Sequence, residues 1–190
     1  MSKTVKSTPQ DRLLATARQL FLAQGIPQTG INTVTAKADI ARMTLYNNFA
    51  SKEELILAVF EKETELRRAA IENAQNASHE PLDKVRALFA VALEQASKAG
   101  FRGCAFVNLA IETAAPDSKL HHLARQHKDW IAQNIQDALG EGYCDDPKTL
   151  SQQIALLWDG GVVGAYIHQS DKPIHLAQSA AESLVKSSRR

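Results

Sequence analysis

Apolar residues recur every three or four positions along most of the chain, which is the spacing of one face of an α-helix. The pattern starts with Leu13, Leu14, Ala17, Leu20 and Phe21 and continues to the end of the sequence. No stretch reads convincingly as a strand, and there is no internal repeat. The sequence therefore predicts an all-α protein of about nine helices with short connections.

Capping residues, prolines and glycines mark where the predicted helices begin and end. Thr8-Pro9 predicts the first start and Gly25 its end. The sequence Ser51-Lys52-Glu53-Glu54 predicts a capping box at the start of a long helix. Further starts are expected at Pro81, Pro116-Asp117, Asp146-Pro147 and Pro173, further ends at Gly100 and near Gly140, and a short apolar segment at about Cys104 to Ala114.

Three glycines interrupt the predicted helix that contains Trp158, namely Gly160, Gly161 and Gly164. A glycine inside a helix lowers its stability by about 1 kcal/mol, so the presence of three calls for a structural explanation. Close approach of helices at a dimer interface is one reason, and a kinked or mobile helix is the other.

The segment 29–52 contains two short predicted helices on either side of a tight turn near Asp39. Such a pair needs the first helix and the start of the long one behind it. Val34, Ala38, Ile40, Leu45 and Phe49 supply its inward face. This arrangement is a helix-turn-helix, which places its second helix in the major groove of DNA.

Charge is distributed unevenly along the chain. Residues 1–52 hold seven basic and two acidic side chains, whereas the remainder holds fifteen basic and nineteen acidic ones. A basic end on an acidic body is expected where that end meets a polyanion, although a solvated basic face gives the same count.

The same segment resembles the signature of the TetR family of bacterial transcriptional repressors. The resemblance covers about residues 8–60 and rests on the opening Thr29, the run RMTLYNNF at 42–49 and Ser51-Lys52-Glu53-Glu54-Leu55. It implies a DNA-binding domain at 7–67, with its motif at about 30–49, and a ligand-binding and dimerisation domain at 68–190. It also implies a homodimer formed through the last two helices, a palindromic DNA operator and a small-molecule inducer that releases the repressor.

Five positions depart from the family pattern. Asp39 stands for the turn glycine, Ala41 for the Ser cap of the second helix, and Thr35, Met43 and Asn48 for Ala, a small residue and His. Asp tolerates a left-handed backbone better than most residues, and the missing cap costs about 0.5–2 kcal/mol. Thr35 either adds a hydroxyl contact to the backbone or crowds the helix pair. We expect a changed operator sequence and retained DNA binding.

The second helix carries side chains suited to both base edges and phosphates. Arg can bind guanine and Asn can bind adenine through paired hydrogen bonds, and hydroxyl groups suit phosphate oxygens. We therefore expect bases to be read by Arg42, Met43 and Asn47, phosphates to be held by Thr44, Tyr46, Asn48 and Lys52, and Asn32 and Thr33 to assist from the first motif helix. The competing interpretation of these residues is an ordinary polar helix surface.

Beyond residue 60 the sequence is less specific. A ligand pocket of apolar walls with few polar groups is predicted from Phe89, Phe101, Cys104, Phe106, Asn108, Glu112, Trp130 and Trp158, although each could equally be core. Cys104 is a candidate redox or electrophile sensor. Since Arg102 is the only basic residue visible near it in the sequence, a buried inert thiol is the favoured interpretation.

Other function classes lack their signatures. His121, His122 and His127 are spaced by one, five and six residues, which does not place two ligands on one helix face, so no metal site is expected. Motifs of hydrolases, nucleotide-binding enzymes and dinucleotide cofactors are missing, so we expect neither an enzyme nor a cofactor. Two cysteines, a polar start and no membrane-length apolar run favour a cytoplasmic protein. The alternative function is a helical ligand carrier or small enzyme with a degenerate head.

Overall fold

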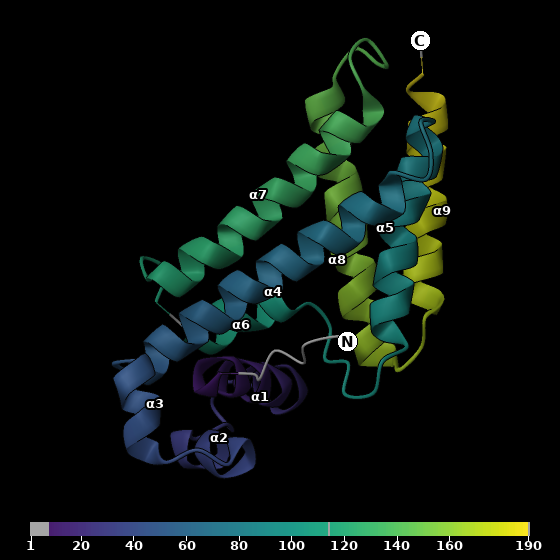
Figure 1. The fold of residues 1–190 in the computed structure, drawn as a ribbon. Helices are drawn as coiled ribbons and strands as arrows, with labels where there is room; N and C mark the ends of the chain where they lie inside the picture. The colour runs from purple at the N-terminus through teal and green to yellow at the C-terminus, as the bar shows by residue number, and fades with distance from the viewer. Residues whose placement is uncertain (1–7, 114, 190) are drawn as a thin grey trace, which may run out of the picture.

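The computed structural model describes residues 8–113 and 115–189, which form nine helices and no strand (Figure 1). The all-α prediction is confirmed. Lys3, Lys6 and the predicted start of the DNA-binding domain at residue 7 lie outside the described residues. The helices are α1 (Pro9–Gln24), α2 (Ile31–Ala38), α3 (Arg42–Asn48), α4 (Lys52–Gln75), α5 (Pro81–Ala96), α6 (Ala105–Thr113), α7 (Lys119–Leu139), α8 (Pro147–His168) and α9 (Lys172–Ser187).

The helix starts follow the caps in the sequence, with one partial exception. The Asp11 N–H donates to Thr8 Oγ1 at 3.1 Å and the Thr8 N–H donates back to the Asp11 carboxylate at 3.0 Å, which is a complete capping box. At α4 the Glu54 N–H donates to Ser51 Oγ at 3.1 Å, but the Glu54 carboxylate accepts from the Ala50 N–H at 2.7 Å. The predicted box is therefore only half correct, because Glu54 reaches one residue further back.

Two predicted boundaries shift by a few residues. Helix α7 begins at Lys119 rather than at Pro116-Asp117, because Ser118 provides the cap and accepts the His121 N–H at 3.1 Å. Helix α5 ends at Ala96, and Gly100 lies in the loop beyond it with a φ of 78°. The caps and ends at Asp146, Gly25 and Gly140 are confirmed.

The glycines of α8 explain how this helix packs within its own chain. Helix α8 is continuous, and a Cβ on Gly161 would lie 3.0 Å from the Cβ of Ala177. A Cβ on Gly164 would lie 2.9 Å from the Cβ of Pro173, whereas Gly160 has open space around it. Gly161 and Gly164 therefore let α8 approach α9 closely. For these two residues the expected close approach of helices is observed, and it occurs within one chain.

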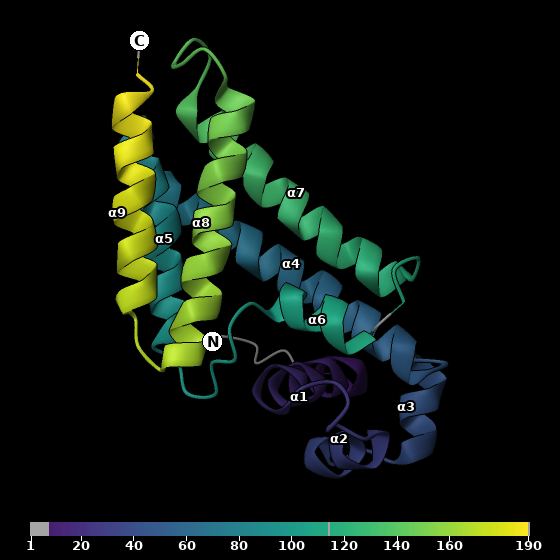
Figure 2. The ribbon, with the colours of Figure 1, turned by 180° about the vertical axis from the view of Figure 1, so that it is seen from behind.

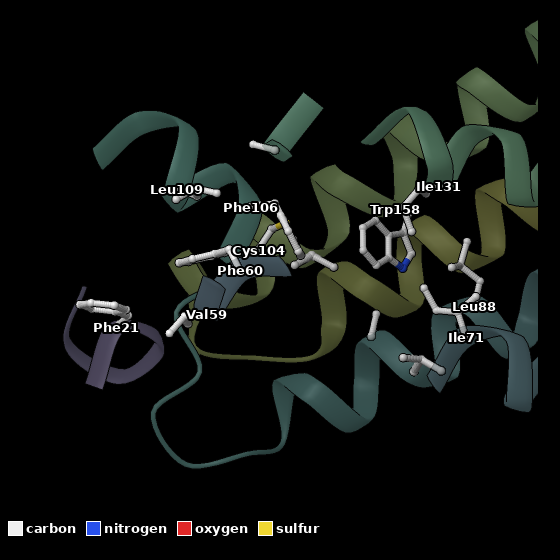
Figure 3. Packing of buried hydrophobic residues seen from close by; sticks show 14 of the residues in the cluster. Phe21, Val59, Phe60, Ile71, Leu88, Cys104, Phe106, Leu109, Ile131 and Trp158 are labelled. Carbon is white, nitrogen blue, oxygen red and sulfur yellow. The ribbon is translucent and has the colours of Figure 1, made fainter. Parts of the chain in front are cut away.

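The helices form a small head joined to a larger body (Figures 1 and 2). Helices α1 to α3 group at one end, α4 extends from them into the body, and α5, α8 and α9 lie side by side. Buried side chains form one cluster that runs from Phe21 in the head through Phe60 and Phe106 to Trp158 in the body (Figure 3). The predicted domain boundary at 67–68 falls inside the unbroken helix α4, which thus belongs to both parts.

Candidate nucleic-acid interface and ligand cavity

The head is built as the sequence predicts, around an apolar face shared by α2 and α3. Val34 and Leu45 are completely buried, Ala38 and Phe49 nearly so, and Ile40 is half-buried. Asp39 occupies the left-handed region with a φ of 53° and ends α2, as expected for the residue that replaces glycine there. The two helices are therefore held in a helix-turn-helix arrangement.

The departures from the family pattern have small, local effects. Ala41 gives α3 no side-chain cap, as predicted, and the Thr44 N–H is satisfied by the Ala41 carbonyl at 2.9 Å. Thr35 Oγ1 donates to the Asn32 carbonyl at 3.1 Å, so its hydroxyl adds a backbone contact. Neither residue disturbs the turn.

The candidate DNA-contacting side chains cover the outer surface of α2 and α3. Arg42, Met43 and Asn47 are exposed, Met43 to 70%. The Arg42 guanidinium lies over the Tyr46 ring, 5.6 Å from its centroid. Among the remaining predicted residues Asn32, Thr33, Tyr46 and Asn48 are exposed, whereas Thr44 and Lys52 are half-buried.

Two of these residues already make contacts inside the head. Asn48 Nδ2 donates to the Thr44 carbonyl at 2.7 Å, and Lys52 Nζ donates to the Ile26 carbonyl at 2.8 Å. Lys52 thus ties the α1–α2 loop to the start of α4, a role that the sequence did not reveal. Its ammonium group keeps further donors for a phosphate.

The same loop is held from the body side by α6. The Ile26 N–H donates to Glu112 Oε2 at 2.8 Å, and Glu112 Oε1 accepts from Arg102 Nη2 at 3.0 Å. Arg102 is positioned in turn through its carbonyl, which accepts from Asn108 Nδ2 at 2.8 Å. We call the contact between Glu112 and Ile26 the head clasp. Both carboxylate oxygens of Glu112 are used in it, which argues against the predicted role of Glu112 as a ligand residue.

Two hollows lie next to each other behind the head clasp. An open groove of about 630 Å³ is lined by α1, α4, α5 and α6, and a small cavity of about 30 Å³ lies deeper in the body. Of the predicted pocket residues, Cys104, Phe106 and Trp158 line the cavity, Asn108 and Glu112 line the groove, and Phe101 lines both.

Two predicted pocket residues, Phe89 and Trp130, line neither hollow. Phe89 is completely buried in the core of the body. The Trp130 ring packs beneath the guanidinium of Arg68, 5.0 Å from its centroid. Both satisfy the apolar pattern of their helices, which does not distinguish the wall of a cavity from the core.

Cys104 has a basic neighbour that its sequence surroundings do not show. Lys128 Nζ lies 3.2 Å from Cys104 Sγ and 2.5 Å from a carboxylate oxygen of Asp159. Burial lowers the pKa of Lys128, but attraction by Cys104 and Asp159 outweighs it and raises that pKa above its usual value. These partners come from α7 and α8, and no spacing in the sequence connects them to Cys104.

His127 also lines the cavity and is 2% exposed. Its ring stacks on Phe106 with centroids 3.7 Å apart, and its Nδ1 has no hydrogen-bond partner. Burial first, and then the charges of Lys128, Arg67 and Arg68, lower the pKa of His127 to about 3. The imidazole is therefore neutral near pH 7.

Comparison with known proteins assigns both parts of the chain. Residues 13–59 match the model of bacterial regulatory proteins of the tetR family, and residues 81–181 match the tetracyclin repressor-like C-terminal domain. The chain belongs to the TetR family. The HTH-type transcriptional repressor NemR of Escherichia coli K12 is 23% identical over 194 residues, covering 97% of this chain and 98% of NemR. The repressor DhaR of Mycobacterium sp. GP1 is 23% identical and covers 87% of this chain and 86% of its own.

Solved structures agree with this membership. A TetR-family transcriptional regulator from Streptomyces coelicolor superposes with a TM-score of 0.90 at 27% identity, covering 96% of this chain and 90% of that one. The reduced form of E. coli NemR shares the fold with a TM-score of 0.81 at 23% identity, covering 92% and 95%.

As a TetR-family member the protein is a DNA-binding transcriptional regulator, and the helix-turn-helix prediction is confirmed. The alternative, a ligand carrier or small enzyme with a degenerate head, is not favoured, because Asp39 adopts the turn conformation that glycine would otherwise supply. Across the described residues, no helix combines the length and the apolar character needed to cross a membrane.

Proposed function

We propose that this TetR-family protein is a homodimeric repressor that binds a palindromic operator in the cytoplasm and is released from it by a small molecule. Arg42, Met43 and Asn47 read base edges from α3. Thr44, Tyr46, Asn48 and Lys52 contact phosphates, and Asn32 and Thr33 assist from α2. The proposal assigns binding roles only and no catalysed reaction.

One observation carries this proposal: Leu45 is completely buried while Arg42 and Asn47 on the same helix are exposed. Helix α3 is thus fixed to the head by one side and offers its polar side outward. A recognition helix needs this orientation, because its anchoring must not consume the side chains that reach base edges.

The dimer is supported by apolar residues that α8 and α9 leave exposed. Leu156 and Ile167 on α8 are 73% and 67% exposed, and Leu176 on α9 is 62% exposed. A second copy placed over this face would bury them in a four-helix bundle. The two heads of such a dimer would read half-sites about 34–36 Å apart in successive major grooves.

Induction is supported by the way the body holds the head. The head clasp joins α6 to the α1–α2 loop, and α6 borders both hollows. A molecule that binds better to a body with displaced α6 would favour heads spaced wrongly for DNA. A coupling of about 1–3 kcal/mol is sufficient for useful regulation.

Selection of bound sequences from a random pool of duplex DNA tests the proposal. We expect a two-fold symmetric product, whose affinity falls steeply with salt because several phosphate contacts release counterions. Arg42→Ala should relax sequence preference. Lys52→Ala should weaken all sequences alike and reduce the salt slope by about one.

Lys62→Ala provides a control that removes a positive charge from an exposed site on α4 outside the proposed surface. It should bind DNA like the parent. An asymmetric product would contradict the dimeric proposal. Unchanged binding by both Arg42→Ala and Lys52→Ala would contradict the contact assignment.

A further inference from the structure

Cys104 lies in a cluster of polar groups that the DNA-binding function does not use. Its thiol lines the small cavity, Lys128 Nζ lies 3.2 Å from the sulfur, and Asp159 holds the same ammonium group at 2.5 Å. The side chain of Lys128 also lies over the Trp158 ring, 5.2 Å from its centroid. Figure 3 shows Cys104 beside Phe106 and Phe60, with Trp158 further along the body. An ammonium group at this distance stabilises negative charge that develops on the sulfur when it reacts.

The cavity wall also contains a polar group without a partner. His127 is 2% exposed, lines the cavity and leaves Nδ1 without a hydrogen bond. A buried polar atom without a partner is unfavourable, so a ligand that supplies a hydrogen-bonding oxygen would stabilise this site. The cluster therefore offers both a nucleophile and a place for an oxygen.

The dimensions of the cavity limit the ligand to a few heavy atoms. Its volume of about 30 Å³ is enough for roughly two water molecules. Phe101, Gly103, Ala105 and Arg67 line both the cavity and the open groove, so the groove gives a short route from solvent to the sulfur.

We propose that Cys104 binds the inducer covalently and that the inducer is a short α,β-unsaturated aldehyde or ketone. This inference rests on the proposed function, since it names the class of molecule that releases the repressor. Lys128 contacts the reacting sulfur and faces the carbonyl end of the ligand. The electrophilic β-carbon suits the sulfur, and the carbonyl oxygen suits the donors around it.

The reaction balances without an oxidant or a reductant. The Cys104 thiol releases its proton to water, and the thiolate forms a carbon–sulfur bond at the β-carbon. The electron pair of the carbon–carbon double bond moves to give an enolate, which takes a proton from the Lys128 ammonium group. Lys128 regains a proton from water, so the net change is addition of the thiol across the double bond.

The adduct has a direct mechanical consequence. A four-carbon enone adds five heavy atoms at the residue that immediately precedes α6, in a cavity sized for about two waters. Because close-packed interiors resist added volume, α6 must shift. The head clasp lies near the other end of that helix.

The test is to treat the full-length protein with less than one equivalent of butenone and to locate the adduct by intact mass and peptide mapping. We expect one adduct at Cys104, forming before any at Cys144, which is also buried but lies in the α7–α8 loop. Lys128→Met should slow that addition about threefold or more, because it removes the ammonium group that contacts the sulfur and supplies a proton to the enolate. Lys128→Arg should keep most of the rate, and Lys119→Met, which removes an exposed cation from the same helix, should leave it unchanged.

DNA binding is measured on the same samples with the selected duplex. The parent modified at Cys104 should lose at least about tenfold in affinity, which corresponds to a coupling of about 1.4 kcal/mol. Cys104→Ser should bind DNA with the affinity of the parent, and butenone should not change that affinity. Preferential reaction at Cys144, an unchanged rate in folded Lys128→Met, or unchanged DNA affinity of the adduct would overturn the inference. Failure to select any DNA would instead refute the proposed function.

Discussion

His127 makes the stability of the protein depend on pH in a defined window. In the folded chain its pKa is lowered to about 3, first by burial and then by the charges of Lys128, Arg67 and Arg68. In an unfolded chain a histidine titrates near pH 6.5. Below that pH the histidine binds a proton in the unfolded state but not in the folded state. The free energy of unfolding therefore decreases as the pH falls from about 6.5 toward 3.

The size of this stability loss follows from how far the pH lies below the pKa of histidine in the unfolded chain. At pH 5 the proton-binding difference has acted over about 1.5 pH units, and each unit is worth about 1.4 kcal/mol. His127 should thus remove about 2 kcal/mol of stability between pH 7 and pH 5. For a protein of this size that is a large part of a total of roughly 5–15 kcal/mol.

Urea unfolding at pH 7, 6 and 5, at one protein concentration, measures this loss. His127→Leu removes the titrating ring while keeping an apolar side chain against Phe106, so its stability should fall by about 2 kcal/mol less than that of the parent over the same range. His122→Gln, at an exposed position on the same helix, should retain the parent's pH dependence.

The range stops at pH 5 to keep carboxylates out of the comparison. The hydrogen bond to Arg86, for example, is the main cause that lowers the pKa of Glu182 to about 2. The stability that this carboxylate contributes to the protein is therefore lost mostly below pH 4.5. If His127→Leu lost as much stability between pH 7 and pH 5 as the parent, the buried neutral imidazole could not be the cause, and the reasoning would be refuted.

Three further changes test the packing and the head. Gly161→Ala should lower the free energy of unfolding by about 1–3 kcal/mol in urea, because the new Cβ meets Ala177 and the α9 backbone. Adding Ala177→Gly should recover part of the loss. Strictly additive effects of the two substitutions would count against a direct clash. Glu63→Gln should cost about 3–5 kcal/mol in thermal unfolding, because this completely buried carboxylate pairs with two arginines; a loss below 1 kcal/mol would contradict that account. Ala41→Ser should raise stability by about 0.5–2 kcal/mol by capping α3, and no gain would mean that the helix start is limited elsewhere.

The head could be predicted from the sequence because its determinants are local. The cap at Thr8, the turn at Asp39 and the buried face of Val34 and Leu45 all lie within about 40 residues and each has a distinct residue preference. The family signature adds the relative order of these features. The tertiary contacts of the α1–α2 loop, from Lys52 to Ile26 and from Ile26 to Glu112, lay beyond this local information.

The body could be predicted only as a set of helices. The sequence indicates that Gly161 needs a reason, but the neighbour that supplies it, Ala177, is on another helix and is chosen by packing. The same limit explains Phe89, since an aromatic residue fits a cavity wall as well as a core. It also explains why Cys104 looked inert: its basic partner Lys128 belongs to a different helix.

The proposed coupling between the cavity and the head has a physically reasonable size. Cys104 and Glu112 are eight residues apart across α6, or about 12 Å along the helix axis, which a rigid helix spans without intermediate rearrangement. The hydrogen bond from Ile26 to the charged Glu112 is worth about 1.5–3 kcal/mol. That range matches the 1–3 kcal/mol that ligand control of binding requires. Loss of the head clasp alone could therefore change DNA affinity enough to regulate, whereas a link through the continuous helix α4 would require the core around Phe60 to repack.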